Sequence, residues 1–88
     1  MEFRWNEWNE GHISEHGVDP QEAEEVVRRA RSPYPLVSTD DKFLVWAPTA
    51  DGRLLQVVFL VDDEDSVFVI QARPLTEKEK RRYRRRLR

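Results

Sequence analysis

The residues with the clearest chemical potential form a basic run near the end of the chain. Six of the seven residues from position 80 to 86 are Lys or Arg, and the seventh is Tyr83. Guanidinium and ammonium groups contact phosphates, while a phenol can stack on a base or transfer a proton. A solvated helix end or a surface for an acidic protein would also explain the run. The candidates for phosphate contact are Lys80, Arg81, Arg82, Arg84 and Arg85.

Arg73 is a second candidate because of its place in the chain. It ends an apolar run and directly precedes Pro74, where a side chain can project over the edge of a sheet. A guanidinium at such a place suits phosphate binding, because its planar fork matches two phosphate oxygens. The alternative is a structural salt bridge, with Glu79 as the partner, and the spacing alone favours that alternative.

His12 and His16 have the spacing of an H-x-x-E-H motif, in which one helix face presents two histidines to zinc. A zinc protease also needs a third ligand, a water site and a cleft, and Gly17 is expected to end the helix. Packed or surface histidines are the preferred interpretation, so no metal site is predicted. The acidic run at 62–65 likewise predicts a solvated hairpin turn rather than a calcium loop, because it lacks the EF-hand pattern.

Composition places these residues on one small domain. The chain has 88 residues, of which 39% are hydrophobic and 36% charged, so residues 1–88 are expected to form a single domain with a thin core. The net charge of −2 hides an asymmetry. Residues 73–88 hold nine Lys or Arg and two Glu, which leaves six basic and fifteen acidic residues before them. Any contact with nucleic acid should therefore be local.

Other features of the composition bear on the compartment. Cysteine is absent, which excludes disulfides and thiolate zinc sites and fits a reducing compartment. No apolar run approaches the roughly 20 residues that cross a bilayer, and the first residues lack a signal-peptide pattern. We therefore expect a soluble protein of the cytoplasm, with no membrane partner.

Alternation of polar and apolar residues predicts five strands. The first is Met1–Trp5, and four more follow at about 35–38, 42–47, 53–61 and 66–73. Short polar connectors between the last four predict antiparallel hairpins. In the strand at 66–73, one face is expected to carry Val67 and Val69, and the other Phe68, Ile70 and Ala72.

Capping patterns predict three helices. Asn6 and Gly17 bound a helix over about 6–16, and Asp19 with Pro20 starts an amphipathic helix over about 20–31. Thr76 and Glu79 open a third helix, whose later turns run from Lys80 to Arg88. The expected architecture is α+β in the order β-α-α-β-β-β-β-α, with an antiparallel sheet of four to five strands packed with helices.

A series of motifs follows in a specific order along nearly the whole chain. Phe3-x-Trp5 precedes a helix, His16-Gly17-Val18 leads into the Asp19-Pro20-Gln21-Glu22-Ala23 helix start, and Ala72-Arg73 precedes Thr76, Glu79 and Tyr83. Between them, Asp51-Gly52-Arg53-Leu54-Leu55 enters a strand that contains Val57-Val58-Phe59. This order of motifs resembles the BrnT family of toxins.

The resemblance implies a RelE-like fold and a type II toxin of a toxin-antitoxin system. Such a protein is a ribonuclease that cleaves mRNA, with the ribosome as the expected place, and so inhibits translation. The resemblance also implies a BrnA-like ribbon-helix-helix antitoxin as partner, and no cofactor. The RNA 2′-OH would attack the neighbouring phosphate.

The resemblance also assigns roles at matched positions. Arg73 would stabilise the phosphate, Tyr83 would donate a proton or stack, and Glu79 would orient them or cap the helix. Arg81 and Arg82 would guide the RNA. The alternative from another class keeps the same fold but makes the protein a non-catalytic module, which binds a protein partner through its sheet and basic helix.

Overall fold

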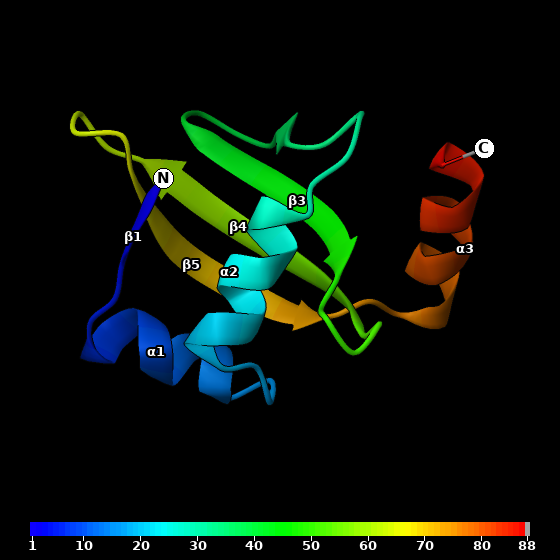
Figure 1. The fold of residues 1–88 in the computed structure, drawn as a ribbon, viewed down its shortest axis with the longest axis horizontal. Coiled ribbons are helices and arrows are strands. Elements are labelled where there is room, and N and C mark those ends of the chain that lie inside the picture. The colour runs from blue at the N-terminus through cyan, green and yellow to red at the C-terminus, as the bar shows by residue number, and fades with distance from the viewer. Residues whose placement is uncertain (88) are drawn as a thin grey trace.

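A five-stranded sheet forms the centre of the fold (Figure 1). The computed structural model describes residues 1–87, and the predicted helix end at Arg88 lies outside them. The α+β class and the predicted order of elements are confirmed. The elements are β1 (Glu2–Arg4), α1 (Glu7–Ser14), α2 (Pro20–Arg28), β2 (Leu36–Val37), β3 (Lys42–Pro48), β4 (Leu54–Val61), β5 (Ser66–Pro74) and α3 (Glu77–Arg86).

The sheet is mixed, with the strand order β1-β5-β4-β3-β2. Strands β2 to β5 pair antiparallel, as their short connectors predicted. β1 instead pairs in parallel with β5, with Phe3 opposite Val67, so the expectation of an antiparallel sheet was wrong for this strand. A tight turn fixes the direction only of strands adjacent in sequence. No such turn joins β1 to β5. The chain instead leaves β1 into α1, which packs beside β5, so β1 runs in the same direction as β5.

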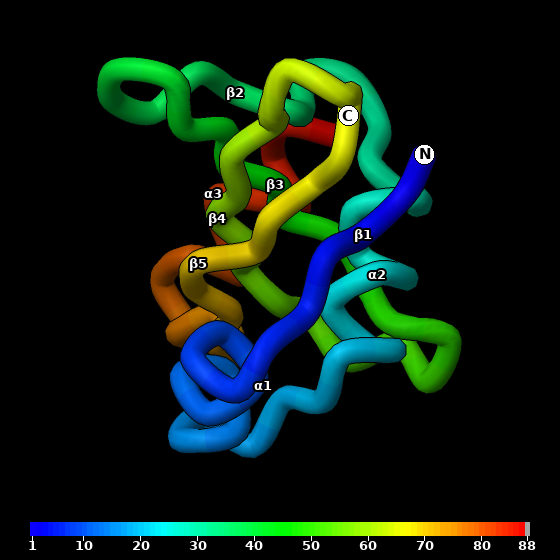
Figure 2. The backbone as a smooth tube through the Cα atoms, turned by 90° about the vertical axis from the view of Figure 1, so that its left-hand side faces the viewer, coloured from blue at the N-terminus to red at the C-terminus, as the bar shows by residue number. Residues whose placement is uncertain are grey.

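Helix α2 covers one face of the sheet, and α1 packs beside β5. In Figure 1, α2 lies across the front of the strands and α1 lies below it, while Figure 2 places α2 on one side of the sheet. The cross-strand partners Val45, Val57 and Ala72 share this face and are buried. They belong to one hydrophobic core with Ile13, Ala23, Val26 and Val27 from the helices.

Local capping chemistry sets the helix starts. Asn6, Asp19 and Thr76 each accept a hydrogen bond from the backbone N–H three residues later, in complete capping boxes. The helix ends fall earlier than predicted, at Ser14 and Arg28. After α1 the chain turns at Gly17, whose φ of +71° favours a residue without a side chain.

A β-bulge changes which residues of β5 face the helices. Val69 lies opposite Phe59, but Gln71 lies opposite the adjacent Val58, so Ile70 is an extra residue in β5. The shift turns Ala72 towards the helix-covered face, where it is fully buried. The prediction that Ala72 shares a face with Ile70 was therefore wrong. The same shift turns Arg73 towards the opposite face, which carries its cross-strand partner Gln56.

The last helix leaves the sheet at the end of β5. Leu75 is buried at the connection, and its N–H donates to the carbonyl of Leu54. Figure 1 places α3 beyond the end of β5, away from α1 and α2. Within residues 1–87, no helix has both the length and the apolar character needed to cross a membrane.

Candidate functional site

Arg73 and Glu79 form a two-pronged ion pair between β5 and α3. The guanidinium donates from Nη1 and Nη2 to the two carboxylate oxygens of Glu79, each at 2.8 Å. The side chains are only 27% and 19% exposed. The hydrogen bonds from Arg73 lower the pKa of Glu79 to about 2, and the pairing raises the pKa of Arg73. The structure thus contains the salt bridge that the spacing favoured.

Glu79 also fixes the start of α3. Its Oε1 accepts a bond from the Thr76 backbone N–H at 2.9 Å, while the Thr76 hydroxyl accepts from the Glu79 N–H. One carboxylate therefore holds the helix cap and the Arg73 guanidinium together. Of the roles predicted for Glu79, orienting Arg73 and capping the helix are geometrically available, whereas no hydrogen bond within residues 1–87 joins it to Tyr83.

Gln56 connects Arg73 to the middle of the sheet. Its Oε1 accepts from the Trp46 indole at 2.9 Å and from Arg73 Nη2 at 3.3 Å. Its Nε2 donates to Gln71 Oε1 at 2.8 Å. Gln56 is the cross-strand partner of both Trp46 and Arg73, and Gln71 lies two residues before Arg73 in β5. All four side chains therefore lie on the face of the sheet opposite α2.

Tyr83 lies one helical turn beyond Glu79, but its side chain is buried. Its ring centroid lies 6.1 Å from that of Tyr34, and burial raises the pKa of the Tyr83 phenol. Arg86 holds the same corner, because it donates to the Tyr34 hydroxyl at 2.9 Å and lies 5.0 Å from the Trp46 ring centroid. In this geometry Tyr83 packs α3 against the body rather than presenting its hydroxyl to solvent.

Apart from Arg86, the basic run occupies the outward side of α3. Lys80 pairs with Glu77 at 3.3 Å. The four other predicted phosphate contacts are exposed and make no ion pair with another residue of 1–87; they are Arg81, Arg82, Arg84 and Arg85. Four arginines in little more than one helical turn create a strongly positive surface beside the Arg73 corner.

A groove of about 530 Å³ lies on the face of the sheet opposite α2. Trp8, His12 and His16 line one side, and Ser38, Thr39 and Lys42 also contribute. Gln56 and Gln71 carry polar atoms in its wall, alongside Leu44, Val58 and Ile70. Gln56 belongs both to this groove and to the Arg73 network, so the two features adjoin.

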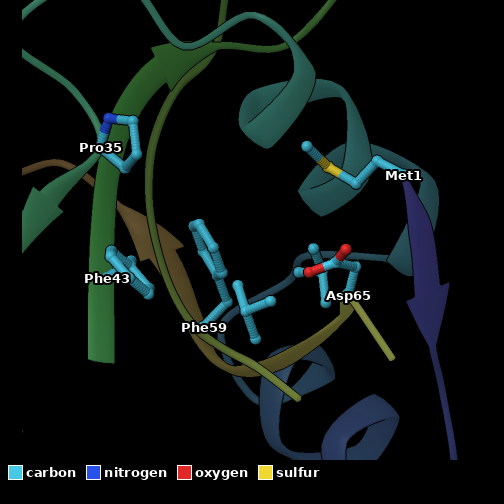
Figure 3. A pocket seen from close by; sticks show the side chains of 7 residues that line it. Met1, Pro35, Phe43, Phe59 and Asp65 are labelled. Atoms are coloured by element: carbon cyan, nitrogen blue, oxygen red, sulfur yellow. The ribbon is translucent and has the colours of Figure 1, made fainter. Parts of the chain in front are cut away.

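A second hollow, of about 410 Å³, has a different character (Figure 3). It lies at one end of the helix-covered face, with the stacked rings of Phe43 and Phe59 beside Met1 and Pro35. Asp65 is its one ionisable side chain among the described residues. None of the predicted functional residues lines it.

The described residues contain no cluster of three or more His, Asp or Glu side chains that could hold a metal. His12 instead stacks on Trp8, with ring centroids 4.3 Å apart. The acidic run forms the predicted hairpin turn between β4 and β5. There the Ser66 and Glu64 backbone N–H groups donate to Asp62, and the first of these bonds is the main cause of its lowered pKa.

Comparison with known proteins adds no relative: no family model, no curated protein and no solved structure matches this chain.

Sequence reasoning identified Arg73, Glu79 and the arginines but missed the groove beside them. His12 and His16 were interpreted as packed or surface histidines rather than metal ligands, and their use as two proton-transfer groups was not considered. Trp8 lines the groove and is 53% exposed. Nothing in the sequence brings Gln56 and Gln71 together, because their contact depends on the register of β4 against β5.

Proposed function

We propose that this chain is a toxin-like ribonuclease with a RelE-like fold, which binds mRNA through α3 and inhibits translation by cleaving it. The observation that carries the proposal is the exposed, unpaired arginine surface of α3 within residues 1–87, next to the partly buried Arg73. The exposed α3 arginines can contact successive phosphates of an RNA backbone, and the partly buried Arg73 can bind one phosphate through two hydrogen bonds. A BrnA-like ribbon-helix-helix antitoxin is the proposed partner.

Arg73 is the group proposed to stabilise the phosphate that reacts. Its two N–H groups already hold two oxygens of Glu79, and a phosphate offers oxygens in a similar arrangement. The guanidinium is therefore preorganised, and RNA would replace or share the carboxylate. Tyr83 would take part as a proton donor only if α3 moved, because its side chain is buried in this geometry.

The same geometry favours a second candidate, a non-catalytic module that binds a protein partner. Glu79 satisfies Arg73 from within the chain, and Tyr83 is used for packing. An acidic partner could then bind the α3 arginines without any chemistry at the corner. The difference between the two candidates is whether Arg73 is needed for an effect on RNA.

Expression of the protein in growing bacterial cells separates the two candidates. The ribonuclease arrests growth and produces cleaved mRNA, and Arg73→Ala should relieve both effects. Arg73→Ala leaves the Glu79 carboxylate without its partner, so the matched folding control is the double variant Arg73→Met, Glu79→Met. A parent protein that neither slows growth nor cleaves mRNA would refute the ribonuclease and favour the module.

RNA binding can be measured separately from cleavage. We expect the double variant Arg81→Gln, Arg82→Gln to bind single-stranded RNA more weakly and with less dependence on salt. Loss of two phosphate contacts should reduce the slope of log K against log salt by about 1.4. The control is Arg28→Gln, Arg29→Gln, which removes two adjacent arginines at the end of α2. If both double variants lost RNA affinity equally, binding would depend only on the total charge of the protein and not on the α3 arginines.

A further inference from the structure

The groove opposite α2 differs from the rest of this acidic chain. The chain has 17 Asp and Glu residues, yet no carboxylate lines this groove among the described residues. Its ionisable side chains are Lys42, His12 and His16. Two other hollows of the surface include acidic residues, such as Glu22 and Glu25 in one and Glu7 and Glu10 in the other. The groove is thus the recess in which an anionic ligand meets least repulsion.

The amide groups in the groove have a fixed orientation. The Trp46 indole can only donate, so the atom of Gln56 that it contacts must be the oxygen. The Gln56 nitrogen must then donate to the oxygen of Gln71. This leaves the Gln71 NH₂ group to donate into the groove, since its side chain makes no other hydrogen bond within residues 1–87. A ligand that supplies a carbonyl or phosphate oxygen would satisfy it.

One side of the groove is aromatic. Trp8 stacks on His12 and meets the edge of Phe68, with ring centroids 6.0 Å apart. These contacts hold the Trp8 ring in place although it is 53% exposed. An exposed aromatic ring that is already ordered gives a base a stacking surface at little entropic cost, and stacking of this kind contributes about 1–3 kcal/mol per base.

We propose that this groove is a nucleotide subsite for single-stranded RNA, in which Trp8 stacks on a base and His12 and His16 transfer protons. The proposal rests on the ribonuclease function proposed above and deepens it. A volume of about 530 Å³ is sufficient for one nucleotide. Lys42 would contact a phosphate and Gln71 would donate to a base carbonyl or a phosphate oxygen. Gln56 links this subsite to Arg73 at 3.3 Å.

The reaction requires no co-reactant. One histidine, neutral, removes the proton from the RNA 2′-OH as its oxygen bonds to the adjacent phosphorus. The bond from phosphorus to the 5′-oxygen of the next nucleotide breaks, and that oxygen takes its proton from the other histidine, which is protonated. The products are a 2′,3′-cyclic phosphate and a free 5′-hydroxyl, and Arg73 offsets the charge that develops on phosphorus oxygens.

Nuclear magnetic resonance can locate the binding of a dinucleotide that cannot react. The probe is 2′-deoxyuridylyl-adenosine, which lacks the attacking hydroxyl. We expect shifts of the Trp8 indole signal, the His12 and His16 ring signals and the Gln71 NH₂ signals. The Trp5 indole, bonded to Glu24 at 2.7 Å, is an internal control and should stay unchanged. Shifts confined to α3, or no shift at all, would overturn the subsite.

Cleavage of a longer RNA tests the two histidines. His12→Gln and His16→Gln should each lower the cleavage rate by about 10²-fold or more, with RNA affinity changed less than about threefold. Glu10→Gln, an exposed change on the same helix outside the groove, should keep the parental rate. Parental rates in both histidine variants would overturn the proton-transfer roles and leave the ribonuclease intact. A parent that cleaves RNA neither free nor on ribosomes would refute the proposed function, while the dinucleotide shifts would still decide the subsite.

Discussion

Replacing Glu79 by Gln should remove most of the energetic coupling between β5 and α3. Lowering the pKa of Glu79 from 4.5 to about 2 corresponds to about 3 kcal/mol of favourable interaction with the charged carboxylate. Gln keeps the capping box, because its side-chain oxygen can still accept the Thr76 N–H. We therefore expect Glu79→Gln to lower the free energy of unfolding at pH 7 by about 2 kcal/mol, the range for a charge-assisted hydrogen bond.

The pH dependence identifies the cause of that loss. The pKa of Glu79 is lower in the folded chain than its ordinary value of 4.5, so its contribution is complete above about pH 4.5 and is lost as the pH falls towards 2. Urea denaturation followed by circular dichroism should thus give parent and variant curves that differ at pH 7 and converge near pH 2. Asp62 titrates in both proteins and cancels in the difference.

The matched control is Glu77→Gln, in the same turn of α3. Glu77 is 78% exposed, and within residues 1–87 Lys80 is its one ion-pair partner, so its loss should change the free energy of unfolding by less than about 0.5 kcal/mol. If Glu79→Gln costs no more than Glu77→Gln, or if the difference from the parent persists unchanged to pH 2, the ion pair does not hold α3 to the sheet and the reasoning fails.

Four further substitutions test the packing of the core and the backbone at two glycines, each by urea denaturation. Ile13→Ala removes a fully buried side chain and should lower the free energy of unfolding by about 2–5 kcal/mol; a smaller loss would mean that α1 does not close the core. Gly17→Ala should lower the free energy of unfolding by about 1 kcal/mol, because φ at this position is +71°. Gly11→Ala, with open space at the added methyl, should raise it by up to about 1 kcal/mol. Changes of the same sign in the two variants would contradict these expectations. Gln56→Leu should cost about 1–3 kcal/mol by leaving the Trp46 indole N–H without its acceptor, and an unchanged tryptophan emission would argue against that contact.

The features that sequence predicted well depend on residues close together in the chain. The three capping boxes involve positions three apart, and the polar turns fix the hairpins of β2 to β5. The Arg73–Glu79 pair spans six residues across one corner and was predicted as an alternative. The parallel pairing of β1 with β5 joins Phe3 to Val67, and no local signal specifies the direction of such a distant contact.

Candidate site residues divide in the same way. The α3 arginines could be recognised from composition alone, because a run of cations has few apolar neighbours to bury it. The burial of Tyr83 could not be recognised from the sequence, because it depends on contact with Tyr34, which lies in a loop 49 residues earlier in the chain. The groove is the least predictable feature. Its walls come from α1, β3, β4 and β5 and from the loop after β2, so it exists only once the sheet has formed.

The single extra residue in β5 determines how these parts meet. With unbroken alternation from Val67 and Val69, position 73 would point towards α2, and a guanidinium would enter the apolar core. The bulge at Ile70 instead turns Arg73 onto the face that carries Gln56, Gln71 and the groove. Gln56 then lies between the groove and the ion pair, bonded to both Gln71 and Arg73. A ligand that draws Gln71 away would therefore act on Arg73 through one intervening side chain, and on α3 through Glu79.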